Sequence, residues 1–351
     1  MTSIHKLHLS VISFFIVGIL GVSMGSSSLA ASDPSTVKIV AGGDLMLGSW
    51  AGETIRERGW DYPFSRLDTI LSDAQVVFAN LEAPFGTGGQ PVEKSYTFQV
   101  HPDLIQVLKS GRINVVSLAN NHILDFGPGV LQETFDLLQR NSIHYTGAGR
   151  NKTESCVPAV IDVGGVRLAF AAYSLTFPEE FWATDSTAGT CFTSHTFFYD
   201  DLRKFKQESD VLIVSFHWGG ELLSAPKDYQ RDLARRTIDA GADIILGHHP
   251  HVVQGIQIYR EKPIFYSLGN FVFGSYSEKA REGMLIKIIW GTQGGLRCRI
   301  YPINVYNKEV EFQPYVLEGE KKRLFLENLN RISLELNDQR NVIGKDAWIM
   351  F

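Results

Sequence analysis

The sequence predicts an α/β domain, and three observations support this. Short apolar runs rich in β-branched residues recur along the chain, a polar cluster follows each run, and helix-like stretches lie between them. Such runs are typical of strands buried on both faces, and strands that alternate with helices form largely parallel sheets. The six runs are Val37–Ala41, Val76–Phe78, Ile113–Leu118, Val211–Phe216, Ile244–Leu246 and Ile264–Leu268.

Helical spacing marks Gly129–Arg140 and Asp228–Ala240, and Gly241 is a typical helix stop. Beyond about Gly283 the runs lengthen. There we expect strands at Met284–Trp290, Leu296–Val305 and Val310–Val316 and a charged amphipathic helix at Lys321–Leu336. We expect this C-terminal part, 286–351, to complete the second sheet and to cap the same domain as 37–285.

The composition is that of an ordinary globular protein. The 351 residues suffice for one large domain or two small ones. Hydrophobic residues make up 44% and charged residues 20%, close to the average for soluble proteins. The net charge of −5 gives no support for the basic surface that nucleic-acid binding requires, so we expect no nucleic-acid partner.

Residues 1–30 have the layout of a secretory signal peptide. Lys6 precedes an apolar run from Val11 to about Met24, and small residues ending in Ala30 follow. The run is shorter than the roughly 20 apolar residues of a membrane span. We therefore expect an exported protein in the periplasm, at the cell surface or outside the cell, with residues 31–36 as a linker. The alternative is an uncleaved N-terminal anchor.

Export would permit disulfides. Cys156 and Cys191 lie in polar, loop-like stretches, whereas Cys298 lies in a strand-like run. One hypothesis is a Cys156–Cys191 bridge with Cys298 free, and the other is three unpaired thiols.

The polar clusters supply the ligands of a metal site. Each cluster lies at the carboxyl end of its predicted strand, which is the edge of an α/β sheet where ligands bind. Carboxylate, amide and imidazole groups together suit Mn, Zn or Fe. Six ligands exceed the needs of one tetrahedral ion and suit two ions that share a carboxylate. The candidates are Asp44, Glu82, Asn121, His217, His249 and His251.

The sharpest local signal is His249-Pro250-His251, which we expect to place both imidazoles on one side of an extended turn. A surface turn with incidental histidines is the alternative. The neighbouring His248 is ambiguous, and we place it beside the ligands rather than among them.

His122 follows Asn121 directly and is the candidate general acid, with Asp125 orienting its ring. The asparagine also fits a helix N-cap, and Asp125 also fits a solvated turn.

The other candidates have weaker signals. Asp44 and Glu82 also fit ordinary turns, and His217 also fits a satisfied core histidine. Glu221 is expected to hold an imidazole in place. Asn270 is expected to be structural or to face the substrate.

Taken in order, these clusters resemble the capsule-synthesis CapA family within the calcineurin-like metallophosphoesterases. The matching stretches are Gly-Asp-Leu-Met-Leu-Gly at 43–48, Asn-Leu-Glu-Ala-Pro at 80–84, Leu-Ala-Asn-Asn-His-Ile-Leu-Asp-Phe-Gly at 118–127, His-Trp-Gly-Gly-Glu at 217–221, His-Pro-His-Val-Val-Gln-Gly at 249–255 and Tyr-Ser-Leu-Gly-Asn-Phe-Val-Phe at 266–273. The resemblance covers roughly Val37 to Phe273. It implies a four-layer α-β-β-α sandwich, one or two bound divalent ions, and His122 as the catalytic acid. It also implies a role with poly-γ-glutamate or a related extracellular polymer or its precursor, and membrane-bound capsule synthesis subunits as partners.

The chain departs from the parent phosphoesterase pattern in two blocks. Met46 stands where the parent has a histidine, and a thioether is a poor ligand for these ions. Glu82 replaces an aspartate. The weakened position leaves two functions open: a metal-dependent hydrolase or transferase, or a non-catalytic assembly or polymer-binding subunit with a degenerate site. A simple phosphoesterase without a capsule role is a third.

Overall fold

The computed structural model describes residues 1–2, 36–193, 197–291 and 295–351. The described residues from Thr36 onward belong to one compact unit. Apart from residues 1–2, the predicted signal peptide lies outside the described residues, as does the linker up to residue 35. In the described part of the chain, no helix combines the length and the apolar character needed to cross a membrane.

The first of two large sheets contains strands from both ends of this unit. Its members are β1 (Thr36–Leu45), β2 (Val76–Leu81), β3 (Val115–Ser117), β4 (His144–Thr146), β13 (Asn270–Val272), β14 (Glu282–Gly291), β15 (Leu296–Asn304) and β16 (Tyr315–Val316). The order is β16-β15-β14-β1-β2-β3-β4, and β13 also pairs with β1. Strands β1 to β4 are parallel, whereas β14 runs antiparallel to β1.

The second sheet comes from the middle of the chain. Its members are β6 (Ala159–Val163), β7 (Val166–Ser174), β9 (Val211–His217), β10 (Ile244–His248), β11 (Ile256–Tyr259) and β12 (Lys262–Phe265). The order is β11-β12-β10-β9-β7-β6, with a parallel centre and antiparallel edges. A small separate sheet pairs β5 (Ala148–Gly149) with β8 (Gly189–Thr190).

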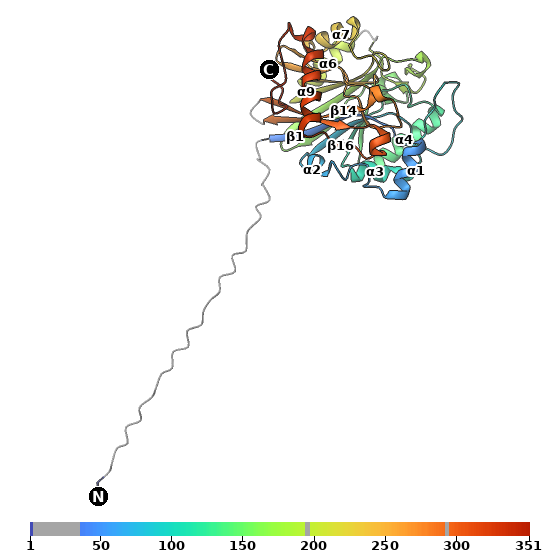
Figure 1. The fold of residues 1–351 in the computed structure, drawn as a ribbon. Helices are drawn as coiled ribbons and strands as arrows, with labels where there is room; N and C mark the ends of the chain where they lie inside the picture. Colours follow the sequence, from blue (N-terminus) through green and yellow to red (C-terminus); the bar gives the residue numbers. More distant parts are fainter. Residues whose placement is uncertain (3–35, 194–196, 292–294) are drawn as a thin grey trace. The chain divides into compact units, whose positions relative to one another are not determined.

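Helices cover the outer faces of both sheets (Figure 1). The helices of the described residues are α1 (Ser49–Arg58), α2 (Asp68–Leu71), α3 (Ile105–Ser110), α4 (Gly127–Arg140), α5 (Lys152–Ser155), α6 (Phe198–Gln207), α7 (Asp228–Asp239), α8 (Asn307–Val310) and α9 (Gly319–Ser333). Single 3-10 turns occur at Pro102–Leu104, Glu179–Phe181, Glu278–Ala280 and Glu335–Asn337.

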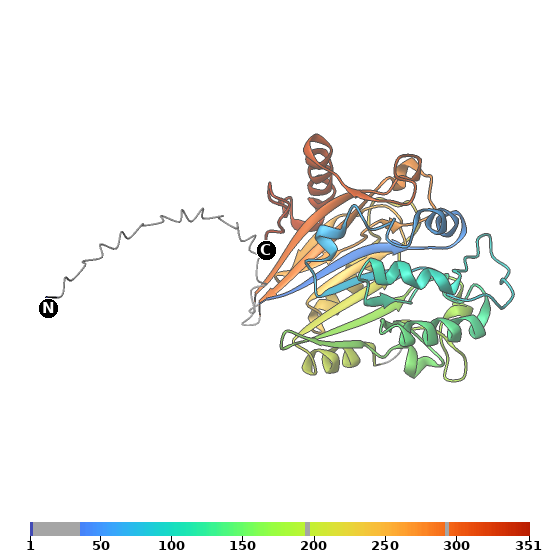
Figure 2. The ribbon, with the colours of Figure 1, turned by 90° about the horizontal axis from the view of Figure 1, so that it is seen from below.

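The layers follow from strand periodicity, because successive side chains of a strand point to opposite faces of its sheet. On β1, Ile39 packs between the sheets, whereas Val40 packs against the helices α1 to α4. On β9, Ile213 packs between the sheets, whereas Leu212 packs against α6 and α7. The result is the four-layer α-β-β-α sandwich implied by the resemblance, so the predicted fold class is confirmed. Helix α9 packs beside β11 and β15 at one side of the two sheets (Figure 2).

Two C-terminal predictions are wrong. The segment Val310–Val316 is not one strand: α8 ends at Val310, and Glu311 and Phe312 have positive φ angles of 46° and 67°. Only its last two residues pair, as β16 with β15. The C-terminal strands also extend the first sheet rather than the second, because β14 pairs with β1 over six residue pairs.

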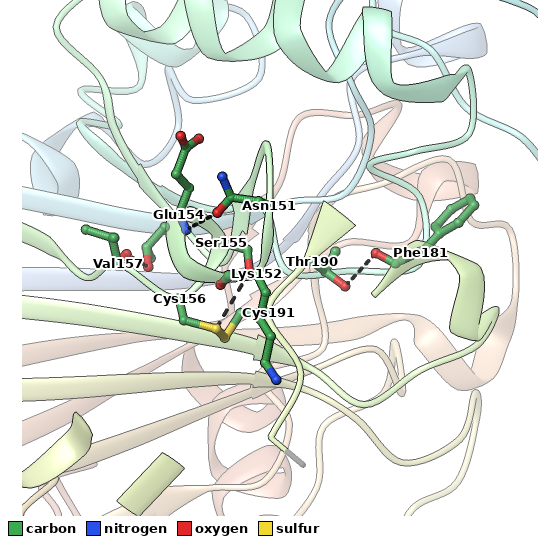
Figure 3. The surroundings of a disulfide bond; sticks show 10 residues. Asn151, Lys152, Glu154, Ser155, Cys156, Val157, Phe181, Thr190 and Cys191 are labelled. Atoms are coloured by element: carbon green, nitrogen blue, oxygen red, sulfur yellow. Dashed lines mark hydrogen bonds between the residues drawn. A yellow bond between two sulfur atoms is a disulfide. The ribbon is translucent and has the colours of Figure 1, made fainter. Parts of the chain in front are cut away.

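A disulfide joins Cys156, directly after α5, to Cys191, directly after β8 (Figure 3). Their Cα atoms are 5.1 Å apart. This is the pairing hypothesised from the sequence. Cys298 on β15 is buried and free, and burial raises the pKa of its thiol.

Candidate metal centre

The predicted ligands meet where the carboxyl ends of the two sheets converge. The first sheet contributes Asp44, Glu82 and Asn121 from the ends of β1, β2 and β3, and the second contributes His217 from β9 and the histidines after β10. The sequence argument placed all of them at the edge of one sheet. Two sheets supply them instead, because the polar ends of β9 and β10 face those of β1 and β2 across the sandwich.

Asp44 is fully buried at the end of β1 and is surrounded by histidines. Its Oδ1 lies 3.3 Å from Nδ1 of His248, and its Oδ2 lies 3.3 Å from Nδ1 of His251. Burial alone would raise the pKa of Asp44, but the two adjacent histidines outweigh it and hold that pKa well below its usual value. Asp44 is therefore a carboxylate anion.

The chain can deliver Asp44 there only because Gly43 precedes it. The backbone N–H of Asp44 donates to the carbonyl of Gly269 at 3.0 Å. A Cβ on Gly43 would lie 1.8 Å from that same oxygen. The absence of a side chain thus allows β1 and the chain before β13 to approach closely.

Glu82 is the central carboxylate of the cluster. Its Oε1 lies 3.8 Å from Nε2 of His217 and 3.7 Å from Nε2 of His251, and this buried oxygen accepts no hydrogen bond from any described residue. Burial raises the pKa of Glu82 well above its usual value, and the negative charge of Asp44 raises it further. A buried carboxyl group beside a buried carboxylate attracts a cation, because the cation's charge would favour ionisation of Glu82.

The His249-Pro250-His251 turn has a different backbone from the one predicted. Both histidines have positive φ angles, 93° for His249 and 58° for His251, so the turn is left-handed at two positions rather than extended. Non-glycine residues rarely adopt this region, and such strain concentrates at functional sites. Here it brings the His249 ring to 4.8 Å from the His217 ring and the His251 ring to the carboxylates.

The three ligand histidines differ in charge. Burial and neighbouring histidines lower the pKa of His217 well below its usual value, and burial together with His251 lowers the pKa of His249 to about 3. Burial alone would lower the pKa of His251 too, but Glu82 and Asp44 raise it to about 9. His217 and His249 are therefore neutral imidazoles, the form that binds metals.

Sequence reasoning missed Asn80, which links the ligands to one another. Its Nδ2 lies 2.8 Å from Oδ1 of Asp44, 3.3 Å from Oε2 of Glu82 and 3.3 Å from Nδ1 of His217. A signal for it existed: Asn80 precedes Glu82 by two residues, so both project from the same face of the chain at the end of β2.

Asn121 and His217 contact each other directly, with Oδ1 and Nε2 2.8 Å apart. The preceding Asn120 is structural: its side chain donates to the carbonyl of Leu81 at 2.8 Å and accepts from the backbone N–H of His122 at 3.1 Å. This arrangement holds the β3 loop against the end of β2 and presents Asn121 to the cluster.

His122 lies beside the cluster with Asp125, as expected. Its Nδ1 is 2.7 Å from Oδ2 of Asp125, which is fully buried. Lys94, which sequence reasoning did not identify, places Nζ 2.7 Å from Oδ1 of Asp125 and 3.2 Å from Nδ1 of His122. Burial lowers the pKa of His122, and Asp125 offsets part of that effect.

The remaining candidates divide. His248 contacts Asp44, and Oδ1 of Asn270 accepts a hydrogen bond from Nδ1 of His251 at 2.9 Å. Asn270 lies in register with Asp44 across β1 and β13. Glu221 does not hold an imidazole: its side chain is exposed, and it forms no hydrogen bond or ion pair with a described histidine. The tight turn after His217 directs Glu221 toward solvent.

The residues present fit a divalent cation. Among the described residues, two groups of three potential ligand atoms lie within 4.8 Å of one another, Glu82 with His249 and His251, and Asp44 with Glu82 and His217. Both groups share Glu82. The buried Oε1 of Glu82 and Nδ1 of His249 have no hydrogen-bond partner in the described part of the chain. Because burying unpaired polar atoms is costly, these atoms are explained by a ligand they would hold.

Two sheets flanked by helices, with carboxylates and imidazoles at the strand ends, are the architecture that the sequence motifs implied. A family model described as "Bacterial capsule synthesis protein PGA_cap" matches residues 38–275, and the chain belongs to this family.

Several curated proteins are similar to this chain over most of their length. The chain is 30% identical over 294 residues to the "PGA biosynthesis protein CapA" of Bacillus subtilis (strain 168), which covers 83% of this chain and 77% of the relative. It is 29% identical over 291 residues to the "Capsule biosynthesis protein CapA" of Bacillus anthracis, covering 81% and 70%. A "Probable polyglutamine synthesis accessory protein" of Mycobacterium tuberculosis is 30% identical over 289 residues, covering 69% and 76%.

Solved structures with a similar fold are more distant in sequence. A putative 5′-nucleotidase from Staphylococcus aureus is 11% identical, with a TM-score of 0.48, and the match covers 85% of this chain and 58% of that one. The sulfate thiohydrolase SoxB from Thermus thermophilus is 12% identical, with a TM-score of 0.46, and the match covers 80% and 48%.

Proposed function

We propose that this chain is an exported, metal-dependent hydrolase or transferase of capsule polymer biosynthesis. One observation carries the proposal: ligand groups from the ends of β1, β9 and β10 converge on Glu82 at the end of β2, and the buried Oε1 of Glu82 has no hydrogen-bond partner among the described residues. A structural zinc site is usually closed by about four ligands that include cysteine thiolates, and this cluster contains no thiolate among its described ligands. A cluster of six nitrogen and oxygen ligands beside a pocket suits a catalytic site with two metal ions.

Asp44, Glu82, Asn121, His217, His249 and His251 would hold one or two ions of Mn, Zn or Fe. When bound, such an ion supplies Lewis acidity and activates water at neutral pH. Asn80 keeps two carboxylates and an imidazole in place through three contacts of its amide. Holding these ligand side chains in fixed positions before and during the reaction is the protein's contribution to catalysis.

His122 is the residue that we assign to proton transfer. Asp125 engages its Nδ1, which leaves Nε2 to exchange a proton with the leaving group. His122 lines the cavity beside the cluster, so it is accessible to a bound substrate. Lys94 neutralises Asp125 and thereby keeps the pair compatible with burial.

The polymer is proposed from the relatives. The names of the two Bacillus relatives refer to capsule and PGA biosynthesis. On that basis the substrate of this chain is an extracellular polymer of the poly-γ-glutamate kind, or its precursor, and membrane-bound synthesis subunits are its partners. Export is supported by the signal-like residues 1–30 and by the Cys156–Cys191 disulfide, since disulfides persist in oxidising compartments.

The test is turnover with and without metal. The protein is incubated with a γ-glutamyl oligomer and with a phosphomonoester, before chelation, after chelation, and after Mn or Zn is restored, and products are identified by mass spectrometry. His249→Ala is compared with His144→Ala, which alters an exposed histidine on β4. We expect chelation and His249→Ala to abolish turnover and His144→Ala to leave it intact.

Turnover that survives both chelation and His249→Ala would defeat the proposal. Metal that is bound without any turnover would instead favour the assembly or polymer-binding subunit, for which Met46 in place of the parent histidine is the supporting observation. Export is tested separately: sequencing the N-terminus of the protein recovered outside the cytoplasm should find a start near residue 31, and a start at Met1 would indicate an anchor.

A further inference from the structure

A cavity of about 580 Å³, the inner cavity, lies beside the candidate metal centre and is within the usual size range of small-molecule sites. His122 and His251 line the end that meets the metal centre. The other charged residues of its described lining are Lys94, whose Nζ pairs with Oδ1 of Asp125 at 2.7 Å, and the exposed Glu221. A divalent ion held by the ligands would add positive charge beside His251. This end of the cavity therefore favours an anionic group of the substrate, despite the exposed Glu221.

A second cavity of about 430 Å³, the outer cavity, adjoins the inner one. Leu222 lines both cavities. The segment that contributes His251 to the inner cavity continues as residues 252–253 in the lining of the outer cavity. A third segment does the same, with Ser277 in the inner lining and Lys279 in the outer. The same three segments thus wall both cavities, which form successive parts of one groove that starts at the metal centre.

The boundary between the two cavities is tied to the turn that carries the metal ligands. The N–H of Leu222 donates to the carbonyl of Pro250 at 2.9 Å, between His249 and His251. Leu222 also has a φ of 58°, in the left-handed region that residues with a side chain rarely adopt. Its side chain is nevertheless 40% exposed, so burial of the leucine does not account for this backbone. The groove is therefore built onto the metal-ligand turn, and strain of this kind concentrates at functional sites.

The outer cavity presents two cations that have no carboxylate partner. Lys279 comes from the 3-10 turn Glu278–Ala280 and Arg331 from α9, and both are exposed. In the described part of the chain, neither forms an ion pair: Arg331 donates only to Oδ1 of Asn328, at 2.6 Å, and Lys279 forms no hydrogen bond. Many other surface arginines do pair with a carboxylate. They include Arg56, Arg167, Arg203, Arg236 and Arg281. Two unpaired cations from different elements at one cavity are suited to bind carboxylates.

The rest of the outer lining suits the backbone of such a chain. Glu282 is the acidic residue of the described lining. Burial raises the pKa of Glu282, and Arg281 and Lys321 counter that effect, so Glu282 has cations of its own and leaves Lys279 and Arg331 uncompensated. The buried side chains of Phe325 and Leu329 on α9 add an apolar surface to the cavity. A chain of γ-linked glutamate carries methylene groups in its backbone and a carboxylate on every unit, which matches an apolar wall beside two cations.

We propose that the outer cavity is a second subsite for the anionic polymer, in which Lys279 and Arg331 bind carboxylates of units beyond the one that reacts. The proposal rests on the proposed function, because it extends the substrate site from the metal centre along the groove. Each exposed ion pair contributes little alone. Once one unit is bound at the metal centre, contacts of the following units become intramolecular, so they add to the affinity together. The subsite thereby selects a polymer over a single glutamate.

The experiment is a calorimetric titration of the full-length protein, loaded with Mn, with γ-linked glutamate of two and ten units and with a decamer whose carboxylates are replaced by carboxamides. Every protein carries His122→Gln, so that a bound oligomer is not turned over. We expect the glutamate decamer to bind more tightly than the dimer and the amide decamer, and less tightly as salt is added. Lys279→Gln/Arg331→Gln should weaken decamer binding roughly tenfold and dimer binding less than about twofold, as two exposed ion pairs beyond the reacting unit imply. Lys109→Gln/Arg140→Gln is the matched control, because it removes the same charge from exposed positions on α3 and α4 that line neither cavity.

Equal decamer affinity in the two double variants, or an amide decamer that binds as tightly as the glutamate decamer, overturns the proposal. Circular dichroism on each variant excludes unfolding as the cause of a loss. Metal content and a titration after chelation separate this proposal from the proposed function. A protein that binds no metal, yet binds the decamer through Lys279 and Arg331, would overturn the proposed enzyme and keep the subsite. A metal-binding protein whose decamer affinity is the same in both double variants would do the reverse.

Discussion

Removing the disulfide should cost this protein several kcal/mol of stability. The bridge joins residues 35 positions apart, Cys156 and Cys191, and Cys191 is buried. Closing a loop in the unfolded chain is worth about 3 kcal/mol for 15 residues and about 4.7 for 100. The same relation gives about 3.8 kcal/mol for 35 residues. We therefore expect the Cys156→Ala/Cys191→Ala protein to unfold with a free energy about 3 to 4 kcal/mol below that of the wild type.

The assay is unfolding in guanidinium chloride, followed by tryptophan fluorescence and circular dichroism. Cys298→Ala is the control, because it removes a buried sulfur that closes no loop, and it should cost about 1 kcal/mol. Reducing agent should lower the wild type to the level of the double variant and leave that variant unchanged. A double variant within about 0.5 kcal/mol of the wild type, or one that still responds to reductant, would refute the loop-entropy argument.

Three further substitutions test other parts of the structure. Asp243→Ala should lower the unfolding free energy by about 2 to 3 kcal/mol, because this buried carboxylate accepts from the Leu212 N–H at 2.9 Å and pairs with two lysines. Asp162→Ala, which removes an exposed carboxylate, should cost under about 1 kcal/mol. Equal losses of unfolding free energy in the two variants would contradict the account. Gly43→Ala should lower the unfolding free energy by at least about 3 kcal/mol, because its Cβ would overlap the Gly269 carbonyl. Gly129→Ala in α4, where the added Cβ has open space, should be neutral or stabilising. Similar thermal unfolding of the two variants would refute the close-approach argument. Asn80→Ala should weaken metal affinity roughly 10- to 100-fold in a chelator competition, and unchanged affinity would mean that Asn80 does not position the ligands.

Much of the fold is readable from the sequence because strand ends are marked locally. Val211–Phe216, which is apolar apart from Ser215, and Ile244–Leu246 are followed by histidines, and both prove to be strands that end at His217 and His248. Sheet membership is not local. Asp44 and Asn270 lie in register although 226 residues separate them, and β14 joins β1 from the far end of the chain. Such pairings depend on tertiary packing, which periodicity does not encode.

The site shows the same division. Residue type and position after a strand were enough to select the six candidate ligands, which the structure brings together. Lys94 escaped notice because it lies in a loop without periodicity, 31 residues before Asp125. Glu221 was overvalued because closeness to His217 in sequence does not fix the direction of a side chain after a glycine turn, and Gly219 has a φ of 89°.

The most direct test of the metal centre is the metal content of the purified protein, measured by elemental analysis for the wild type, His249→Ala and His144→Ala after loading with Mn, Zn or Fe and removal of excess ion. The account predicts one or two equivalents in the wild type and in His144→Ala, and a loss in His249→Ala, whose ring lies 4.8 Å from that of His217. A wild type that retains no metal, or a His249→Ala protein that retains as much as the wild type, would contradict it.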